Sequence, residues 1–445
     1  MDQFRRATIA TCALVLSVAT AGLLAQRDWG RLPLGVPNWP YRHAVPFYVF
    51  PGVQLSVWWS TAALPVVAAV VAGVLALHRS AVGWPVRVAA SAVLLFVLAL
   101  ATSAMAGGPA AWAAPFQDAG EYPHGVGLVA SVPAFLRHFP ELVPALPFHA
   151  RAHPAGAMVL YALLGRLWPG LGGAAVLTVA IGALGAGAVA GLARDELGDD
   201  GGRLALALWV LSPVVVLYTA TSADAVFALV LASSALAADR GLRRRSVAWT
   251  LAGGAGLWAS SMLTYAAVLL LAFLLVRAAG GLRQDPGWVA RWAALTAATV
   301  LALAGLLALA TGYDVVAAVR AGHAAYAAAP GSAGRFWLLY LAGDPVAFGA
   351  MLGLPLLAAL AARAAAVVRE RAWTSFDAAA LALLVAGSAW GFSKAEVERI
   401  FLFMAPLLLV PAARQLLAWR VRIGVVAALL VAQTLLVQAF CFTRW

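Results

Sequence analysis

The chain has 445 residues, of which 64% are hydrophobic and 11% are charged, and it carries a formal net charge of +12. Because a typical soluble domain has about 25% charged residues, this composition excludes that class and indicates a membrane protein with many spans. The positive charge does not indicate nucleic-acid binding, because the basic residues cluster in short connections between apolar runs, a pattern typical of membrane orientation. We therefore expect membrane lipid as a partner and expect no nucleic acid.

Long apolar runs recur from one end of the chain to the other, and they predict an all-α polytopic membrane protein with about thirteen transmembrane helices. The chain has no repeat of fixed period and no separate polar domain, so we expect residues 1–445 to form a single transmembrane domain. The predicted spans cover residues 7–25, 59–77, 88–105, 172–193, 204–218, 225–238, 247–260, 263–276, 292–310, 336–362, 376–391, 400–418 and 423–440.

Basic residues in the connections predict how the chain is oriented in the membrane. Arginine is most concentrated in "DRGLRRRS" at residues 239–246, and connections rich in Lys and Arg are cytoplasmic. This places the N-terminus in the cytoplasm of a multi-pass plasma-membrane protein, and it places three long connections on the outer face: residues 26–58, 106–171 and 311–335. Long connections often carry functional residues, and apolar residues at helical spacing within these predict helices that lie in the membrane interface.

The most polar part of the second connection reads "PFQDAGEYPHGV" at residues 115–126 and contains Asp118, Glu121 and Tyr122. Charged side chains at the membrane face of so apolar a chain are costly to retain without a role. We therefore expect a site here, and the alternative is a solvated acidic loop tip. Downstream, His153-Pro154 starts an apolar segment that is too short to span the membrane comfortably.

These residues resemble the first large outer loop of GT-C glycosyltransferases, in which an acidic residue closely precedes a Tyr and a His-Pro pair later begins an apolar helix. Here the pattern is carried by Asp118, Glu121, Tyr122 and His153-Pro154. The resemblance extends over about half of the chain, through the Ser212-Pro213 kink and the acidic residue of a small outer turn, Asp224.

The sequence departs from the GT-C pattern at two points. Ala155 stands where the usual His-Pro-Pro has its second proline, and two additional spans precede the acidic segment. The extra spans bring in Asp28, in "RDWGRLP", as a rival catalytic acid. We rank it below Asp118 because no His-Pro helix follows it.

The resemblance implies transfer of a sugar from a polyprenyl-phosphate donor to an acceptor hydroxyl of a glycan, glycolipid or protein, with mannose and arabinofuranose as the first donors to test. Such chemistry needs one carboxylate as a base and cations that hold the phosphate. Asp118 is the expected base, with Tyr122 beside it. Glu121 is expected to be its partner, a sugar-binding group or a ligand of a divalent metal, since relatives in this fold differ over metal use.

For two further residues, the sequence is compatible with both a functional interpretation and a simpler structural one. Asp224 is expected either as a second acid that contacts substrate or as a helix N-cap, for which Thr221 and Ser222 compete. His153 either lines the donor site or hydrogen-bonds within its own helix.

The segment "WGFSKAEVERIFLFMAPLLL" begins the penultimate span and contains Lys394, the only lysine of the chain, followed by Glu396, Glu398 and Arg399. It resembles a segment near the C-terminal end of actinobacterial membrane glycosyltransferases. Glu398 or Arg399 must turn toward the protein as the helix enters lipid, which predicts a buried ion pair or a phosphate contact. Arg399 is the leading candidate phosphate ligand and Lys394 the second, and the alternative is an interfacial snorkelling cluster.

In the third connection, His323 and Tyr326 follow Val316 and Val319 at helical intervals and predict another interfacial helix. The two are candidates for contact with the donor or the acceptor, against the simpler interpretation of a surface helix. No spacing of histidines or cysteines predicts a metal centre. The alternative function for the whole chain is a transporter or flippase of a lipid-linked envelope precursor.

Overall fold

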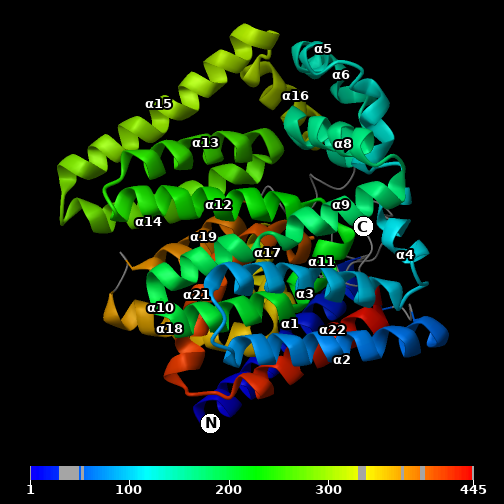
Figure 1. The fold of residues 1–445 in the computed structure, drawn as a ribbon, viewed down its shortest axis with the longest axis vertical. Helices are drawn as coiled ribbons and strands as arrows, with labels where there is room; N and C mark the ends of the chain where they lie inside the picture. Colours follow the sequence, from blue (N-terminus) through cyan, green and yellow to red (C-terminus); the bar gives the residue numbers. More distant parts are fainter. Residues whose placement is uncertain are drawn as a thin grey trace.

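The computed structural model describes residues 2–29, 50–51, 55–328, 337–371, 375–390 and 396–442. Over these residues the chain is helical apart from one short antiparallel ladder between β1 (Phe50–Pro51) and β2 (Cys441–Phe442). Most of the long helices run side by side (Figure 1). The prediction of an all-α protein is confirmed.

Eight helical stretches in the described part of the chain are long and apolar enough to cross a membrane, which indicates a membrane-embedded protein. The count of about thirteen spans stays a prediction. The eight are α2 (Val57–Arg79), α3 (Trp84–Ala104), α9 (Leu171–Ala183) with α10 (Ala186–Leu211), α12 (Asp224–Arg243), η4 (Tyr265–Leu269) with α14 (Leu270–Leu282), α15 (Pro286–Thr311), α20 (Val397–Ile400) through η5 (Phe401–Met404) to α21 (Ala405–Ala418), and α22 (Ile423–Phe440).

The remaining helices are shorter, or fall outside these length and composition limits. The second long connection is folded into a chain of short helices and the third contains the helix α16, while the location of these helices in the membrane interface stays a prediction. Their bounds are α1 (Asp2–Trp29), α4 (Ala110–Ala113), η1 (Ala114–Gln117), η2 (Tyr122–Leu128), α5 (Val132–Arg137), α6 (Phe139–Leu142), η3 (Val143–Ala145), α7 (Phe148–Arg151), α8 (Ala155–Leu167), α11 (Pro213–Thr221), α13 (Val247–Leu263), α16 (Val315–Ala327), α17 (Trp337–Leu352), α18 (Leu354–Glu370) and α19 (Phe376–Trp390).

The predicted span 336–362 is wrong as a single helix, because it is divided into α17 and α18 at Gly353. This residue has φ +136°, a conformation that favours glycine, and a Cβ added to it would collide with the side chain of Leu430. The Ser212-Pro213 kink is confirmed as a break between α10 and α11. There the Ser212 hydroxyl donates a hydrogen bond of 2.6 Å to the carbonyl of Leu352.

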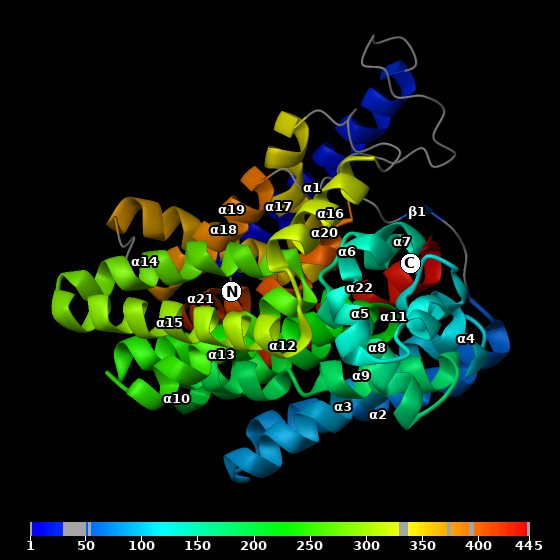
Figure 2. The same cartoon turned by 90° about the horizontal axis from the view of Figure 1, so that it is seen from above.

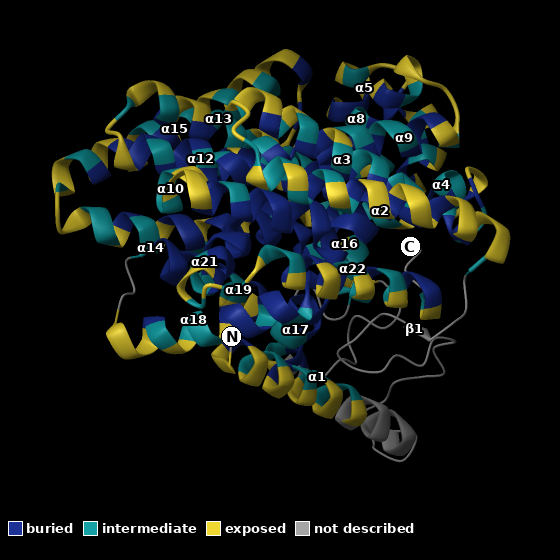
Figure 3. Cartoon of the chain, turned by 60° about the horizontal axis from the view of Figure 1, so that its bottom comes forward, coloured by how far each residue is buried: buried dark blue, intermediate teal, exposed yellow. Residues whose placement is uncertain are grey.

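The helices form successive layers with α12 and α21 in the middle. In Figure 2, α2 and α3 lie along one side and α17, α18 and α19 along the other, in keeping with contacts from α2 to α3, α3 to α10, α10 to α21, and α21 to α18. The burial of residues follows the order of these layers, and the middle of the molecule is the most buried (Figure 3). The interior is dark blue, whereas α15 exposes Leu301, Leu306 and Leu309 by 71%, 62% and 87%. Leucines on an outward face suit a helix that borders lipid.

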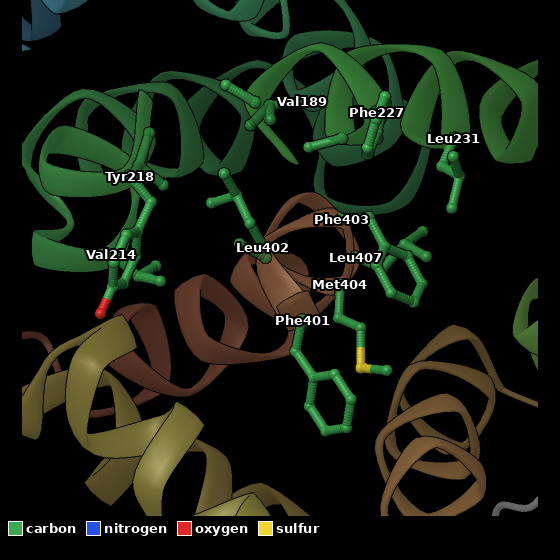
Figure 4. Packing of buried hydrophobic residues seen from close by; sticks show 14 of the residues in the cluster. Val189, Val214, Tyr218, Phe227, Leu231, Phe401, Leu402, Phe403, Met404 and Leu407 are labelled. Atoms are coloured by element: carbon green, nitrogen blue, oxygen red, sulfur yellow. The ribbon is translucent and has the colours of Figure 1, made fainter. Parts of the chain in front are cut away.

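The buried turn η5 fixes the position of the chain between α20 and α21. Phe401, Leu402, Phe403 and Met404 form η5 and are each at most 3% exposed. Figure 4 shows these side chains spreading in different directions from the turn, with Leu402 and Phe403 directed to the side where Phe227 of α12 lies. Because η5 is held on all sides, the short helix α20 before it is held in a defined place.

Candidate functional site

The acidic loop at residues 118–121 is a tight turn that turns one carboxylate outward and one inward. Asp118 is exposed, and its Oδ1 accepts a 2.6 Å hydrogen bond from the backbone N–H of Gly120, a local bond typical of Asp in turns. The N–H of Glu121 donates to the Asp118 carbonyl at 3.0 Å. Glu121 is only 4% exposed. The turn therefore leaves the Asp118 side chain at the protein surface and directs the Glu121 side chain into the interior.

A second short segment, α7, is attached to this turn. The backbone N–H of His149 donates to the carbonyl of Gly120 at 3.0 Å, and its ring Nε2 lies 3.6 Å from Oε1 of Glu121. Burial raises the pKa of Glu121 to about 8, against the opposing effect of Arg399 and with further upward effects of Asp224 and Asp118. Burial and then Arg399 lower the pKa of His149 to about 4. At neutral pH both side chains are therefore mostly uncharged.

Asp224 and Arg399 bring α12 and α20 together at the same place. Asp224 is the first residue of α12 and is 9% exposed, and its Oδ2 lies 3.5 Å from Nη1 of Arg399. The same oxygen accepts a hydrogen bond from the Ser222 hydroxyl. Ala223, not Asp224, holds the N-cap position. The N-cap interpretation of Asp224 is therefore wrong, and its carboxylate takes part in a buried ion pair beside a helix N-terminus that favours negative charge.

Arg399 is 11% exposed in its side chain and lies between two carboxylates. Its Nη2 bonds Oε2 of Glu396 at 2.7 Å, so the two terminal nitrogens face Asp224 and Glu396. Its Nε is buried and has no hydrogen-bond partner among the described residues. Glu396 has φ +60°, a left-handed conformation that costs a non-glycine residue about 1 kcal/mol or more and is enriched at functional sites. We call Glu121, His149, Asp224, Glu396 and Arg399 the Arg399 cluster.

An aromatic group lies against this cluster. Tyr122, 3% exposed, stacks on Tyr161 with ring centroids 5.0 Å apart and an interplanar angle of 8°. Its ring also meets His153 edge-on at 5.8 Å, and the His153 ring lies 5.3 Å from that of Phe227. Burial lowers the pKa of His153, so this ring favours the neutral form. His153 Nδ1 lies 3.3 Å from the carbonyl of Leu263 in α13, so it does not bond within its own helix.

The structure thus brings together most of the residues that the sequence selected. Glu121, Tyr122, His153, Asp224 and Arg399 converge, with Asp118 on the rim of the same turn. One inward turn, of Glu398 or Arg399, was expected of α20, and both side chains turn inward, because Glu398 is 1% exposed and Arg399 is paired with Asp224.

Other predicted residues lie at the edge of the site or outside the described residues. On α16, His323 is exposed and Tyr326 is half-buried. This helix packs against α7, which places it near His149 without bringing His323 into the cluster. Lys394 and the side chain of Asp28 lie outside the described residues.

Sequence reasoning missed four members of the site: His149, Tyr161, Glu396 and Phe227. Glu396 stood within the quoted segment but had no assigned role, and the only signal for His149 was its proximity in sequence to His153. Phe227 follows Asp224 by three residues, which puts both on one face of α12. Its interpretation as an ordinary buried apolar residue would have been the natural one.

Across the described ranges, no three His, Cys, Asp or Glu side chains are grouped in a way that could hold a metal ion. No family model, curated protein or solved structure matches the chain.

Proposed function

We propose that the chain is a GT-C-type membrane glycosyltransferase that moves a sugar from a polyprenyl-phosphate donor to an acceptor hydroxyl at the outer face of the plasma membrane. Within this proposal the chain crosses the membrane about thirteen times, the N-terminus is cytoplasmic, and the acceptor belongs to a glycan, a glycolipid or a protein. Mannose and arabinofuranose remain the first donors to test.

The observation that carries the proposal is the pairing of Arg399 with Asp224 beside Glu121. These residues come from three segments far apart in the sequence, and they bury an arginine among several carboxylates. Buried charge is expensive unless it is paired, and the buried, unpartnered Nε of Arg399 offers a remaining donor. Such a site suits a ligand that presents both a phosphate and sugar hydroxyls.

The proposed reaction needs one proton transfer and one substitution. The acceptor hydroxyl loses its proton to the exposed carboxylate of Asp118, and its oxygen forms the new bond to the anomeric carbon. The bond from that carbon to the phosphate oxygen breaks, and the electron pair leaves with the lipid phosphate. Arg399 balances the added negative charge through Nε, and through a terminal nitrogen if the phosphate displaces Asp224 or Glu396.

Glu121 has a different role from Asp118 in this scheme. With a pKa of about 8 it holds its proton at neutral pH, so it donates a hydrogen bond and is a poor base. Among the roles left open by the sequence, this favours sugar or phosphate binding by Glu121. The aromatic side chains of Tyr122, Tyr161 and Phe227 support the turn at residues 118–121 from the protein interior. They also exclude water from this side of the site.

The arrangement of charge along α12 supports the proposed orientation. Asp224 begins this helix, whereas Asp239, Arg240 and Arg243 lie in its last two turns. Residues 224 and 240 are separated by roughly 24 Å at 1.5 Å per residue. The arginine-rich end, favoured for the cytoplasm, is thus far from the Arg399 cluster.

The test is sugar transfer by the purified full chain with a radiolabelled polyprenyl-phosphate mannose or arabinose donor. Asp118→Asn should lower transfer by about 10²–10⁴-fold, the usual contribution of a general base, while the protein still folds and inserts. The matched control is Glu141→Gln, because Glu141 is an exposed carboxylate of the same outer loop. Full transfer by Asp118→Asn would reject this residue as the base. Movement of the intact lipid-linked sugar across vesicles without transfer would instead favour the transporter alternative.

A further inference from the structure

A crevice of about 480 Å³ lies between α3 and the α9 to α10 stretch, and none of its lining residues belongs to the Arg399 cluster. Most of its lining is apolar and small, with Val88, Ala89 and Ala92 on one wall and Gly187 and Ala190 on the other. Its volume falls within the roughly 300–1,000 Å³ of ordinary ligand pockets. Because Ala89 is exposed, the crevice opens on the outer surface of the helical bundle, where lipid surrounds a membrane protein.

The crevice is polar only at one end. Arg194 lies there with its guanidinium 4.3 Å from the ring centroid of Trp84, and Arg240 completes the lining. Trp84 is the first residue of α3 and Ala92 stands eight positions later, so the apolar part extends for roughly 12 Å along the helix. This is close to the ~15 Å depth of one bilayer leaflet, half of the hydrocarbon core.

Both arginines keep nitrogens available at this end. Arg194 bonds Asp199 through Nε at 2.9 Å, and Arg240 bonds Asp195 through Nε at 2.6 Å. Among the described residues, the terminal nitrogens of these two arginines form no hydrogen bond. Nη2 of Arg240 lies 3.3 Å from the position that a Cβ on Gly191, another lining residue, would occupy.

The charges around this end leave a positive excess. The two nearby carboxylates, those of Asp195 and Asp199, carry less negative charge than the positive charge of the arginines around them. The guanidinium groups nearby belong to Arg87, whose charge lies 5.5 Å from the Trp84 ring, and to Arg194, Arg240 and Arg244.

We propose that this crevice binds an anionic phospholipid, with one acyl chain between α3 and α10 and the phosphate at Arg194 and Arg240. An apolar groove that ends in arginines matches a lipid with a negative headgroup, because guanidinium groups bind phosphate oxygens in pairs and basic pockets between membrane helices bind such headgroups. Each buried methylene of the chain adds favourable free energy of binding. The proposal does not depend on the sugar-transfer reaction.

Gly187 allows the crevice to be filled without disturbing the protein. A Cβ added to it would meet only Val88, at an ordinary contact distance of 3.8 Å, so a leucine there would extend into the crevice. Gly187→Leu should also raise the helix propensity of α10. The matched control is Gly305→Leu on α15, where an added Cβ would meet nothing within 4 Å.

The experiment adds phosphatidylglycerol or phosphatidylcholine with identical acyl chains to the delipidated full chain in detergent. Bound lipid is counted by native mass spectrometry, and the shift in melting temperature is recorded. We expect phosphatidylglycerol to bind with one strong site and to raise the melting temperature more than phosphatidylcholine does. Gly187→Leu should abolish the strong site and Gly305→Leu should keep it.

Two further measurements separate the contribution of the lipid's charged headgroup from that of its acyl chain. Arg194→Ala should weaken phosphatidylglycerol binding about tenfold or more, which is the effect of losing 1.4 kcal/mol, whereas Arg283→Ala, a change at an exposed arginine elsewhere, should not. Inorganic phosphate alone should give no comparable shift. Equal binding of the two lipids, an unchanged strong site in Gly187→Leu, or an equal shift with inorganic phosphate would each overturn the proposal. If Arg194→Ala does not fold, Gly187→Leu and the lipid comparison still decide it.

Discussion

The two ends of α12 use charge in different ways. At its C-terminal end, Asp239 pairs with Arg277 and Arg243, and Arg277 also bonds Glu196 of α10 at 2.9 Å. At its N-terminal end, Arg399 serves both Asp224 and Glu396, and the nearby Glu121 stays protonated at neutral pH. Among the residues that the structure describes, the first end has several arginines for its acids, and the second has several acids for one arginine.

This difference separates a structural network from a candidate site. In the C-terminal network each buried carboxylate has at least two arginine partners, and the network joins α10, α12, α14, α18, α19 and α21 through Glu196, Asp239 and Asp377. Paired in this way, buried charges hold helices in register. At the other end, the unpartnered Nε of Arg399 and the perturbed pKa of Glu121 are features that accompany ligand binding.

The largest effect is expected from Arg399→Ala, because this change affects both folding and the proposed chemistry. Loss of the guanidinium removes the ion pair with Asp224 and the hydrogen bond to Glu396, and it should lower the free energy of unfolding by about 3–5 kcal/mol. Transfer by the molecules that remain folded should fall by a further 10²–10³-fold, roughly the effect of removing one group that stabilises developing charge. Arg320→Ala, a change at an exposed arginine of α16, is the control. Unimpaired transfer by folded Arg399→Ala would remove Arg399 from the site.

Arg277→Ala should reproduce the folding defect without the chemical one. Its guanidinium is 10% exposed and bonds Asp239 at 2.7 Å, so its loss leaves the buried Asp239 with only the more distant Arg243, at 3.6 Å, and should lower the free energy of unfolding by about 3–5 kcal/mol. Transfer per folded molecule should stay at the wild-type level. Thermal unfolding and transfer assays on the same samples, with Arg283→Ala as the control, separate the two quantities. A selective loss of transfer would contradict the structural role of this end.

Glu121→Gln should change the pH dependence of stability. The ordinary pKa of 4.5 rises to about 8 in the folded chain, so the folded state keeps a proton that the unfolded state has already lost. The stability contributed by this protonation is fully present below pH 4.5 and is lost as the pH rises through about 8. Melting temperatures from pH 5 to 9 should therefore fall less steeply in Glu121→Gln than in the wild type. Parallel curves for the two proteins, or the same flattening in Glu141→Gln, would show that Glu121 is not the group that titrates.

The smallest effect is expected from Arg244→Ala at the C-terminal end of α12. The Arg244 side chain is 52% exposed, and its partner Asp195 keeps Arg240 at 2.6 Å. An exposed ion pair contributes about 0–1 kcal/mol, so the melting temperature should change little. A loss as large as that of Arg277→Ala would mean that the network cannot be divided into buried and exposed pairs.

The sequence predicted the candidate site better than it predicted the helices around it. Asp118, Glu121, Tyr122, His153, Asp224 and Arg399 were selected because charged or polar side chains are conspicuous in a chain of such low charge, and because of a resemblance in their order. The span 336–362 was wrong as a single helix because hydropathy reports apolar composition, whereas the break comes from the backbone conformation of Gly353 beside Leu430.

The roles of the individual residues within the site could not be predicted from the sequence. Asp118 and Glu121 are three residues apart and look equivalent as a pair of acids. The turn at Gly120 makes one exposed and the other buried, and burial is the largest cause of the raised pKa of Glu121. His149 entered the site through a backbone bond to Gly120, a contact that no pattern of side chains predicts.

By itself, the sequence determined that the chain is helical and apolar, where its charged residues are concentrated, and which polar residues need an explanation. Those properties follow from composition and local spacing, which act over a few residues. Only the tertiary structure decided that Arg399 pairs with Asp224, which lies 175 positions earlier in the chain, and that Glu121 is buried beside them. Pairing and burial depend on which helices pack together, and packing is settled by the fit of side chains from the whole chain.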